Sequence, residues 1–276
     1  MKRTVFITGA SSGMGKAAAE KFANEGFTVY AAARRVEKMR DLQNLGINVL
    51  TMDVTDEQSM VDGITQILEK EGKIDILVNN AGYGEYGAIE DVPLEKARYQ
   101  MEVNVFGAAR LIQLVLPAMI ENGYGKIVNI TSIGGKIASA FGGWYHASKF
   151  ALEALSDSLR NEVRTFGVDV IVVEPGGIKT EWGDIAAGNL RKISGTGRYA
   201  KSANSFADML TGVNNSIGET AGTEPKIITD LIYEAVTTEQ PETRYSAGFM
   251  AKEMLEMRKN LSDREFDRLA HQQLGM

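Results

Sequence analysis

A tyrosine and a lysine four residues apart have the spacing best suited to acid–base chemistry in this chain. Tyr145 and Lys149 stand at positions i and i+4 of an expected helix, so they share one helix face. A free tyrosine has a pKa near ~10, and a neighbouring ammonium group favours the phenolate. A tyrosine tuned in this way can protonate a carbonyl oxygen or deprotonate an alcohol. Ser132, just past an expected strand, can hydrogen-bond the same substrate oxygen.

A glycine-rich turn near the N-terminus predicts a site for a dinucleotide. The turn runs from Thr8 to Gly15, follows a short apolar strand and starts a helix. Its glycines let the backbone approach a pyrophosphate, and the helix N-terminus offers free N–H groups. The spacing is G-x-x-x-G-x-G rather than the commoner G-x-G-x-x-G. A P-loop is excluded because Ala17 follows Lys16, where a magnesium-binding hydroxyl is required. The alternative is a tight strand–helix turn without a ligand.

The residues after the second expected strand favour NADP(H) over NAD(H). A site for NAD(H) places an acidic residue about 20 positions beyond the turn, where it binds the ribose 2′-hydroxyl. This chain has Arg34 and Arg35 there instead. Their guanidinium groups suit a 2′-phosphate, and Ser11 could add a hydroxyl contact. The alternative is two solvated arginines, but the missing acidic residue favours the phosphate.

Short β-branched runs alternate with helix-like stretches along the chain. Strands are expected at 4–8, 27–31, 47–52, 74–78, 126–130, 168–173 and, more briefly, 243–246; helices are expected at 16–24, 36–44, 56–70, 94–119, 144–166, 224–237 and 251–274. This alternation implies right-handed βαβ crossovers and a sheet covered on both faces. The sequence therefore predicts an α/β fold: a Rossmann-like, doubly wound, mostly parallel seven-stranded sheet with helices on both faces, in a single domain over 1–276.

One stretch breaks this pattern. From 179 to 222 the periodicity weakens, and glycine, serine, threonine and asparagine are frequent. A weakly structured loop of this length inside a domain is usually functional. We interpret it as a mobile substrate-covering segment, with a disordered insertion as the alternative.

Composition narrows the class of protein further. The 276 residues carry a net charge of −6, which argues against nucleic-acid and anionic-membrane partners. Cysteine is absent and the only histidines are His146 and His271, so we expect no metal site. The N-terminus reaches Gly9 too early for a signal peptide, and no apolar run approaches the ~20 residues of a membrane span. We therefore expect a soluble, cytoplasmic protein.

Taken together, the motifs resemble the short-chain dehydrogenase/reductase family over roughly residues 3–182. The turn and the Ser132, Tyr145 and Lys149 set are joined by Asp53-Val54, Asn79-Asn80-Ala81-Gly82, Asn104, Pro175-Gly176 and Thr180. Within the family the chain resembles NADP-dependent carbonyl reductases and the branch of hydroxysteroid- and retinol-type dehydrogenases. Met14 stands where the family usually has isoleucine, a mild packing change.

The resemblance implies four catalytic roles. Tyr145 is the proton donor or acceptor, and Lys149 binds the nicotinamide ribose and tunes Tyr145. Ser132 orients the carbonyl, and Asn104 holds a water in the proton relay.

It also implies a set of cofactor contacts. Asp53 and Val54 lie at the adenine, and the Asn80 to Gly82 segment lies near the adenosine ribose. The segment from Pro175 to Ile178 approaches the nicotinamide. As alternatives, Asp53 only caps a turn and Asn79 stabilises the sheet. The full expected set is Gly9, Ser11, Ser12, Gly13, Met14, Gly15, Arg34, Arg35, Asp53, Val54, Asn80, Ala81, Gly82, Tyr145, Lys149, Pro175, Gly176, Ile178 and Thr180.

The expected function is that of an NADPH-dependent carbonyl reductase, reversible as an alcohol dehydrogenase. The candidate pocket residues are mostly apolar, which predicts a bulky hydrophobic substrate; any of them could equally be ordinary core: Tyr83, Tyr86, Ile133, Phe141, Trp182, Phe206 and Met209, with Glu85 and Lys179 near the rim. Glu153, Asp157, Arg160 and Arg164 are interpreted as a solvated helix face.

Two other functions remain open, as does the assembly. One is a non-catalytic dinucleotide-binding sensor or scaffold on the same fold. The other is an epimerase or dehydratase on a related fold. The resemblance suggests a homodimer or homotetramer through the helices that carry Asn104 and Tyr145.

Overall fold

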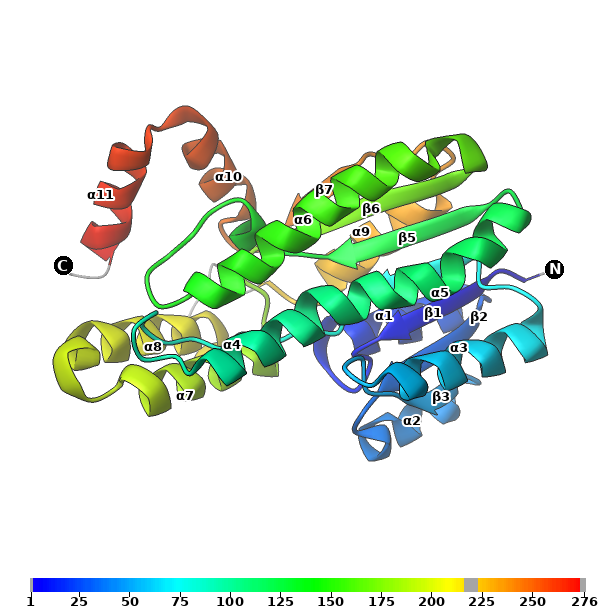
Figure 1. The fold of residues 1–276 in the computed structure, drawn as a ribbon, viewed down its shortest axis with the longest axis horizontal. Helices are drawn as coiled ribbons and strands as arrows, with labels where there is room; N and C mark the ends of the chain where they lie inside the picture. The colour runs from blue at the N-terminus through cyan, green and yellow to red at the C-terminus, as the bar shows by residue number, and fades with distance from the viewer. Residues whose placement is uncertain (1, 216–222, 274–276) are drawn as a thin grey trace.

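The computed structural model describes residues 2–215 and 223–273, and their fold is the expected doubly wound sheet (Figure 1). Seven strands, each parallel to its neighbours, lie in the order β3-β2-β1-β4-β5-β6-β7. They are β1 (Thr4–Thr8), β2 (Thr28–Ala33), β3 (Asn48–Thr51), β4 (Ile76–Asn79), β5 (Gly125–Ile130), β6 (Val168–Pro175) and β7 (Arg244–Ala247).

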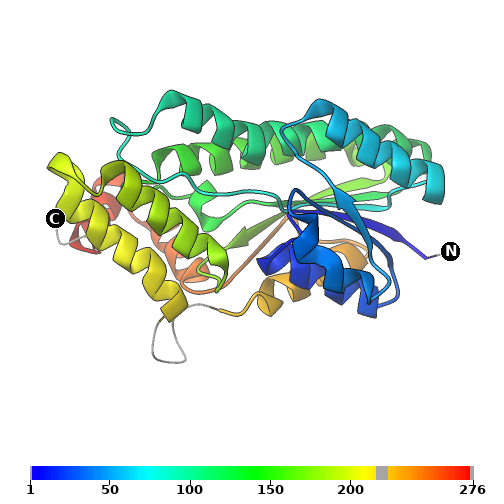
Figure 2. The ribbon, with the colours of Figure 1, turned by 90° about the horizontal axis from the view of Figure 1, so that it is seen from below.

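Helices cover both faces of the sheet, as Figure 2 shows with the sheet seen edge-on. The first half has α1 (Gly13–Asn24), α2 (Arg40–Gln43), α3 (Glu57–Glu71), α4 (Leu94–Met101) and α5 (Gly107–Glu121). The second half has α6 (Gly143–Val163), α7 (Glu181–Ser194), α8 (Ala200–Asn215), α9 (Lys226–Thr237), α10 (Ala251–Asn260) and α11 (Asp263–Gln273).

The core is divided by the sheet into two layers. In β1, Val5 and Ile7 face the layer of α1 and α9, whereas Phe6 faces the layer of α3 and α5. Successive strand residues point to opposite faces, so a strand covered on both sides must be apolar throughout. That requirement explains the unbroken apolar run that marked β1 in the sequence.

The strand order also places the site. The chain runs outward from β1 to β3 and then returns to add β4 on the other side of β1, so the strand order reverses between β1 and β4. Ligands of such folds bind in the crevice at the carboxyl ends of the strands at that point. The glycine turn follows β1 there, and Asn80 follows β4.

The helix expected at 94–119 is one continuous rod with a special turn inside it. A π-helical turn, Glu102–Phe106, joins α4 to α5 and carries Asn104. The rod Leu94–Glu121 is long and apolar enough to span a membrane by length and composition, which corrects the expectation that no run qualifies. A core helix passes the same test, and Leu111, Val115 and Met119 are fully buried in the layer beneath the sheet.

The prediction of a weakly structured segment at 179–222 is wrong for its described part. Residues there form α7 and α8, which pack against each other; residues 216–222 lie outside the described residues. Alanines make this contact, and the sequence pattern hid them because alanine is weakly hydrophobic. The fully buried ones are Ala186, Ala187, Ala203 and Ala207.

The single helix expected at 251–274 is also wrong, because it is two helices. Leu261 is extended and ends α10. The Ser262 N–H and hydroxyl then donate to Glu265 Oε2 over 2.8 and 2.6 Å, which is the glutamate half of a capping box. This S-x-x-E signal is visible in the sequence and starts α11.

Candidate active site

Two cavities share walls along the carboxyl edge of the sheet. One, of about 390 Å³, is lined by the glycine turn, the two arginines and the residues after β3 and β4. The other, of about 290 Å³, is lined by the ends of β5 and β6 and by α6, α7 and α8. Both are bordered by Met14, Asn80, Gly82, Tyr83, Thr180 and Trp182.

The glycine turn is a preformed cradle. Gly9 and Gly13 have φ of +67° and +55°, a region that favours glycine. Asn80 Nδ2 donates to the carbonyl oxygens of Thr8 (2.9 Å) and Gly9 (3.3 Å) and so holds the turn against β4. The Ser12 side chain makes no capping hydrogen bond to α1. The first N–H groups of α1 therefore face the cavity free of a side-chain cap, which fits a pyrophosphate.

The three residues that are expected to bind a 2′-phosphate lie together at the larger cavity. Arg35 Nη2 donates to Ser11 Oγ over 3.3 Å, and both residues line the larger cavity. Arg34 lines it too and donates to Tyr99 OH over 2.7 Å. Glu181 Oε2 lies 3.8 Å from Arg35 Nη2, so the guanidinium already has one anionic partner. These side chains suit a 2′-phosphate by charge and by hydrogen-bonding capacity.

Asp53 caps a turn and also borders the larger cavity, and its contact with the adenine stays a prediction. Its Oδ1 accepts from the N–H and the hydroxyl of Thr55 over 2.9 and 2.8 Å, which caps the turn after β3. With Val54 it also lines the larger cavity. Asn79 does not face either cavity and instead donates to Asn129 Oδ1 over 2.9 Å inside the sheet.

Ser132, Tyr145 and Lys149 meet at one wall of the smaller cavity. Lys149 Nζ donates to Ile130 O over 2.9 Å and lies 5.9 Å from the centre of the Tyr145 ring. A hydrogen bond joins Ser132 to the Tyr145 phenol. Ser132 Oγ also accepts from the Gly134 N–H over 3.0 Å, which fixes the hydroxyl at the strand end.

The electrostatics of this wall correct one expectation. Burial raises the pKa of Tyr145 to about 12, and the hydrogen bond with Ser132 opposes this only in part. Burial also lowers the pKa of Lys149 to about 8, against the charge of Glu153. The protein alone therefore keeps Tyr145 protonated, ready to donate, rather than lowering its pKa as the spacing suggested.

Asn104 is held by the fold rather than open to the cavities. Its Oδ1 accepts from the Tyr83 N–H over 3.1 Å. Its Nδ2 donates to Tyr83 O and Ser148 Oγ, each over 2.9 Å. It lines neither cavity. Its role in holding a water stays a prediction.

Some of the expected substrate-pocket residues line the smaller cavity, and others do not. Tyr83, Tyr86, Ile133, Trp182 and Phe206 line the smaller cavity. Phe141 instead packs behind it against Tyr199 and Phe206.

The remaining candidates face elsewhere. Met209 is 42% exposed, and Leu210 takes its place because Phe206 and Leu210, four residues apart, share the inner face of α8. Glu85 and Lys179 line neither cavity: they pair with Lys96 (2.8 Å) and Glu224 (3.4 Å).

Sequence reasoning missed His146, which lines the smaller cavity beside Tyr145. Its Nε2 accepts from the Ser139 N–H over 3.1 Å, so its Nδ1 carries the proton that is donated to Gly134 O over 3.0 Å. Burial lowers the pKa of His146, so the ring is neutral at pH 7. Its place directly after Tyr145 was the available signal.

The solvated face expected on α6 is wrong for Glu153. That side chain is buried at 3% exposure, whereas Arg164 is exposed. Asp157 and Arg160 are half-buried and pair with each other over 2.6 Å.

Comparison with known proteins gives consistent matches over most of the chain. A family model described as short chain dehydrogenase matches residues 3–187. A 3-ketodihydrosphingosine reductase from Bacteroides thetaiotaomicron is 36% identical over 245 residues, covering 88% of this chain and 87% of the relative. An NADPH-dependent 3-dehydrocapnine reductase from Ornithobacterium rhinotracheale is 34% identical, covering 88% and 87%.

Mouse retinol dehydrogenase 7 is 33% identical, covering 90% of this chain and 81% of the relative. Among solved structures, a short-chain dehydrogenase from Streptomyces avermitilis has a TM-score of 0.81 at 31% identity, covering 99% of this chain and 98% of that one. Similar structures contain NADP in some cases and NAD in others.

Proposed function

Because this chain belongs to the short-chain dehydrogenase/reductase family, we propose that it transfers a hydride between NADP(H) and a carbonyl or secondary alcohol substrate. One observation carries the proposal: Ser132, Tyr145 and Lys149 meet in a cavity that shares its wall with the glycine cradle. When bound, the nicotinamide supplies or accepts the hydride. Two relatives named as reductases support the reductive direction.

Ser132, Tyr145 and Lys149 have separate roles in the proton transfer that accompanies the hydride. Ser132 holds the substrate oxygen by a hydrogen bond, and Tyr145, protonated at neutral pH, gives that oxygen its proton. The ammonium of Lys149 stabilises the negative charge that develops on the phenol oxygen. In the direction of alcohol oxidation the same proton returns to Tyr145.

NADP(H) is proposed as the cofactor because of the charge around Ser11. Arg34 and Arg35 line the cavity wall where the adenosine ribose is expected. No acidic residue stands directly beside them in the sequence, where one would bind the ribose diol of NAD(H). The test of the whole proposal is NADPH oxidation by the purified protein over a panel of carbonyl compounds, with NADH in parallel. A lack of turnover with every ketone would contradict it.

The substrate is proposed to be bulky and apolar. The smaller cavity is walled by Tyr86, Trp182, Phe206, Leu210 and Ile137. Each methylene buried against such a wall contributes about 0.8 kcal/mol, or roughly fourfold in kcat/KM. We expect kcat/KM for 2-alkanones to rise steadily with chain length until the cavity is full. Small polar ketones turning over faster than long ones would contradict this.

A matched pair of variants tests which face of α8 binds the substrate. Leu210→Asp places a carboxylate in the cavity wall, so kcat/KM for long ketones is expected to fall by about tenfold or more. Met209→Asp makes the same change on the exposed side of the same helix and is expected to leave kcat/KM unchanged. Equal losses in the two variants would show that helix stability, rather than the wall, is responsible.

A homodimer or homotetramer is proposed as the working assembly. The helices carrying Asn104 and Tyr145 expose Phe106 (55%), Phe150 (44%) and Leu155 (44%), and exposed large apolar side chains gathered on adjacent helices are typical of interfaces. Light scattering is expected to give two or four times the chain mass. The mass of one chain would contradict this assembly.

A further inference from the structure

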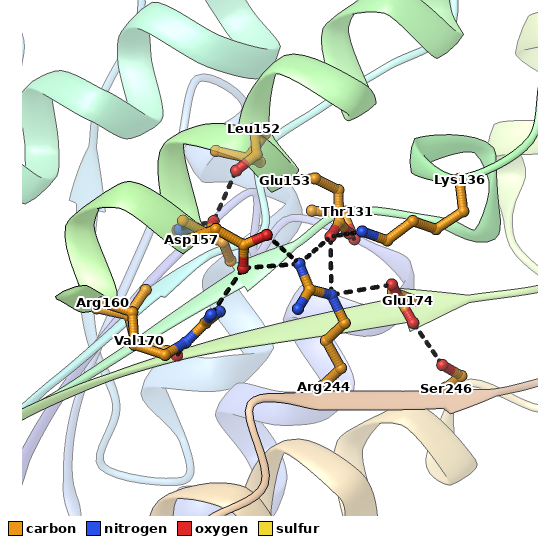
Figure 3. A network of polar contacts seen from close by, with 12 residues as sticks. Thr131, Lys136, Leu152, Glu153, Asp157, Arg160, Val170, Glu174, Arg244 and Ser246 are labelled. Atoms are coloured by element: carbon orange, nitrogen blue, oxygen red, sulfur yellow. Dashed lines mark hydrogen bonds and ion pairs between the residues drawn. The ribbon is translucent and has the colours of Figure 1, made fainter.

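The buried carboxylate of Glu153 lies one helical turn beyond Lys149 and is the centre of a polar network behind the site (Figure 3). Its Oε1 accepts from the Thr131 hydroxyl over 2.6 Å. Its Oε2 lies 3.0 Å from Lys136 Nζ and 3.0 Å from Arg244 Nη2. A carboxylate at 3% exposure needs such partners to offset its lost hydration. The cations that supply them come from two separate segments of the chain.

Arg244 extends the network to the edge of the sheet. From β7 it also binds Asp157, with 2.7 Å to each carboxylate oxygen, and its Nε lies 3.5 Å from Glu174 Oε1. Glu174 in turn accepts from the Ser246 hydroxyl over 2.6 Å. None of Glu153, Asp157, Glu174 and Arg244 lines either cavity. Any effect of this network on the site is therefore transmitted through other residues.

Two of those residues are already in the site. The carboxyl end of β5 is bonded to one face of α6 by three consecutive residues: Asn129 with Ser156, Ile130 with Lys149 and Thr131 with Glu153. Ser132 is the next residue along the chain. The face of α6 that carries Tyr145 and Lys149 is therefore locked in register with the strand end that carries Ser132.

We propose that Glu153 is a positioning residue of this site. Through Thr131 it fixes the strand end that carries Ser132, and through its charge it supports the ammonium form of Lys149. The catalytic consequence rests on the proposed function, whereas the two contacts are properties of the chain itself.

The charge effect has a definite sign. Burial lowers the pKa of Lys149 to about 8, and the Glu153 carboxylate opposes this by stabilising the ammonium. On its own helix, Lys149 lies near Tyr145 and is influenced by the charge of Glu153. Glu153 pairs with Lys136 after β5 and with Arg244 on β7, and Arg244 also pairs with Asp157 on α6 and Glu174 on β6. Removing the Glu153 charge lets Lys149 lose its proton at a lower pH.

The first test reads Lys149 directly and needs no substrate. The ε-methylene signals of ¹³C-labelled lysine are titrated by NMR, with Lys149→Arg used to assign the signal. In Glu153→Gln, which keeps the side-chain size and an oxygen for Thr131, the midpoint is expected to fall by about one pH unit. The alkaline loss of activity is expected to move to lower pH with it.

Asp157→Asn is the matched control. It removes a carboxylate from the same network and the same helix, also bound to Arg244, but one turn further from Lys149. The Lys149 midpoint is expected to stay at its wild-type value. An equal shift in both variants would show that general loss of charge, and not Glu153, is responsible.

The hydrogen bond is tested separately from the charge. Thr131→Val keeps the Glu153 charge and removes only the hydroxyl, so kcat is expected to fall by about tenfold with the Lys149 midpoint unchanged. Glu153→Asp keeps the charge but shortens the side chain, and is expected to behave in the same way. This variant also serves if Glu153→Gln does not fold.

An unchanged Lys149 midpoint in Glu153→Gln would overturn the proposal, as would wild-type kcat in Thr131→Val. Failure of the proposed function would give a different experimental result from failure of the Glu153 proposal. A wild-type protein that oxidises no NADPH with any carbonyl compound refutes the reductase, while the Lys149 titration still decides whether Glu153 supports that ammonium.

Discussion

Replacing Tyr145 by phenylalanine is expected to lower kcat for NADPH-dependent carbonyl reduction by about 10²–10⁴-fold, the usual contribution of a positioned proton donor. The phenyl ring keeps its packing against Tyr86 and Trp182, whose ring centres lie 5.6 and 5.2 Å away. The variant loses only the hydroxyl that hydrogen-bonds Ser132. NADPH binding is therefore expected to stay near the wild-type level, and stability should change little.

The measurement is NADPH absorbance loss for turnover and NADPH fluorescence for binding. Tyr124→Phe is the control, because the Tyr124 hydroxyl is buried without a hydrogen-bond partner among the described residues and lies outside both cavities. Near wild-type turnover in Tyr145→Phe would refute the proton-donor role. Tight NADPH binding by a wild-type protein that reduces nothing would instead favour the sensor or scaffold alternative.

The second large effect is expected on kcat/KM for NADPH when the arginines near Ser11 are replaced. Hydrogen bonds to charged groups contribute about 1.5–3 kcal/mol, so Arg35→Ala is expected to lower kcat/KM for NADPH by about 10- to 150-fold. The value for NADH should stay the same or rise slightly, since its ribose carries no 2′-phosphate. The double variant with Arg34→Ala is expected to reverse the preference between the two cofactors.

Arg40→Ala removes the same charge from the same region but does not touch the larger cavity, so it controls for long-range electrostatics. Steady-state kinetics with both cofactors at several salt concentrations separate the two effects, because salt screens distant charges more than a direct contact. A parallel loss for NADPH and NADH in Arg35→Ala would mean that the arginine supports the fold of the pocket instead.

Local patterns predicted the fold and the centre of the site. The β1–turn–α1 unit could be located because a strand buried on both faces, a glycine turn and a helix start each leave a mark within a few neighbouring residues. The shared face of Tyr145 and Lys149 follows from the helix period alone. The seven-stranded parallel sheet followed from the alternation of strands and helices.

The sequence predictions were wrong where segments that are distant along the chain pack against each other. Weak alanine patterns in α7 and α8 became a helix pair only because each supplies the other's close-packed surface. Likewise Leu210, rather than Met209, faces the cavity because of how α8 sits on α7.

By itself, therefore, the sequence determined the class of fold, the glycine turn after β1 and the shared helix face of Tyr145 and Lys149, since each depends on spacing along one element. Only the tertiary structure decided the protonation of Tyr145 and Lys149 and the burial of Glu153. Those depend on how much water is excluded and on charges such as Arg244, which lies 91 residues away along the chain from Glu153 but within hydrogen-bond distance in the fold. Electrostatic free energy depends on distance and hydration in space, and spacing along the chain does not record either.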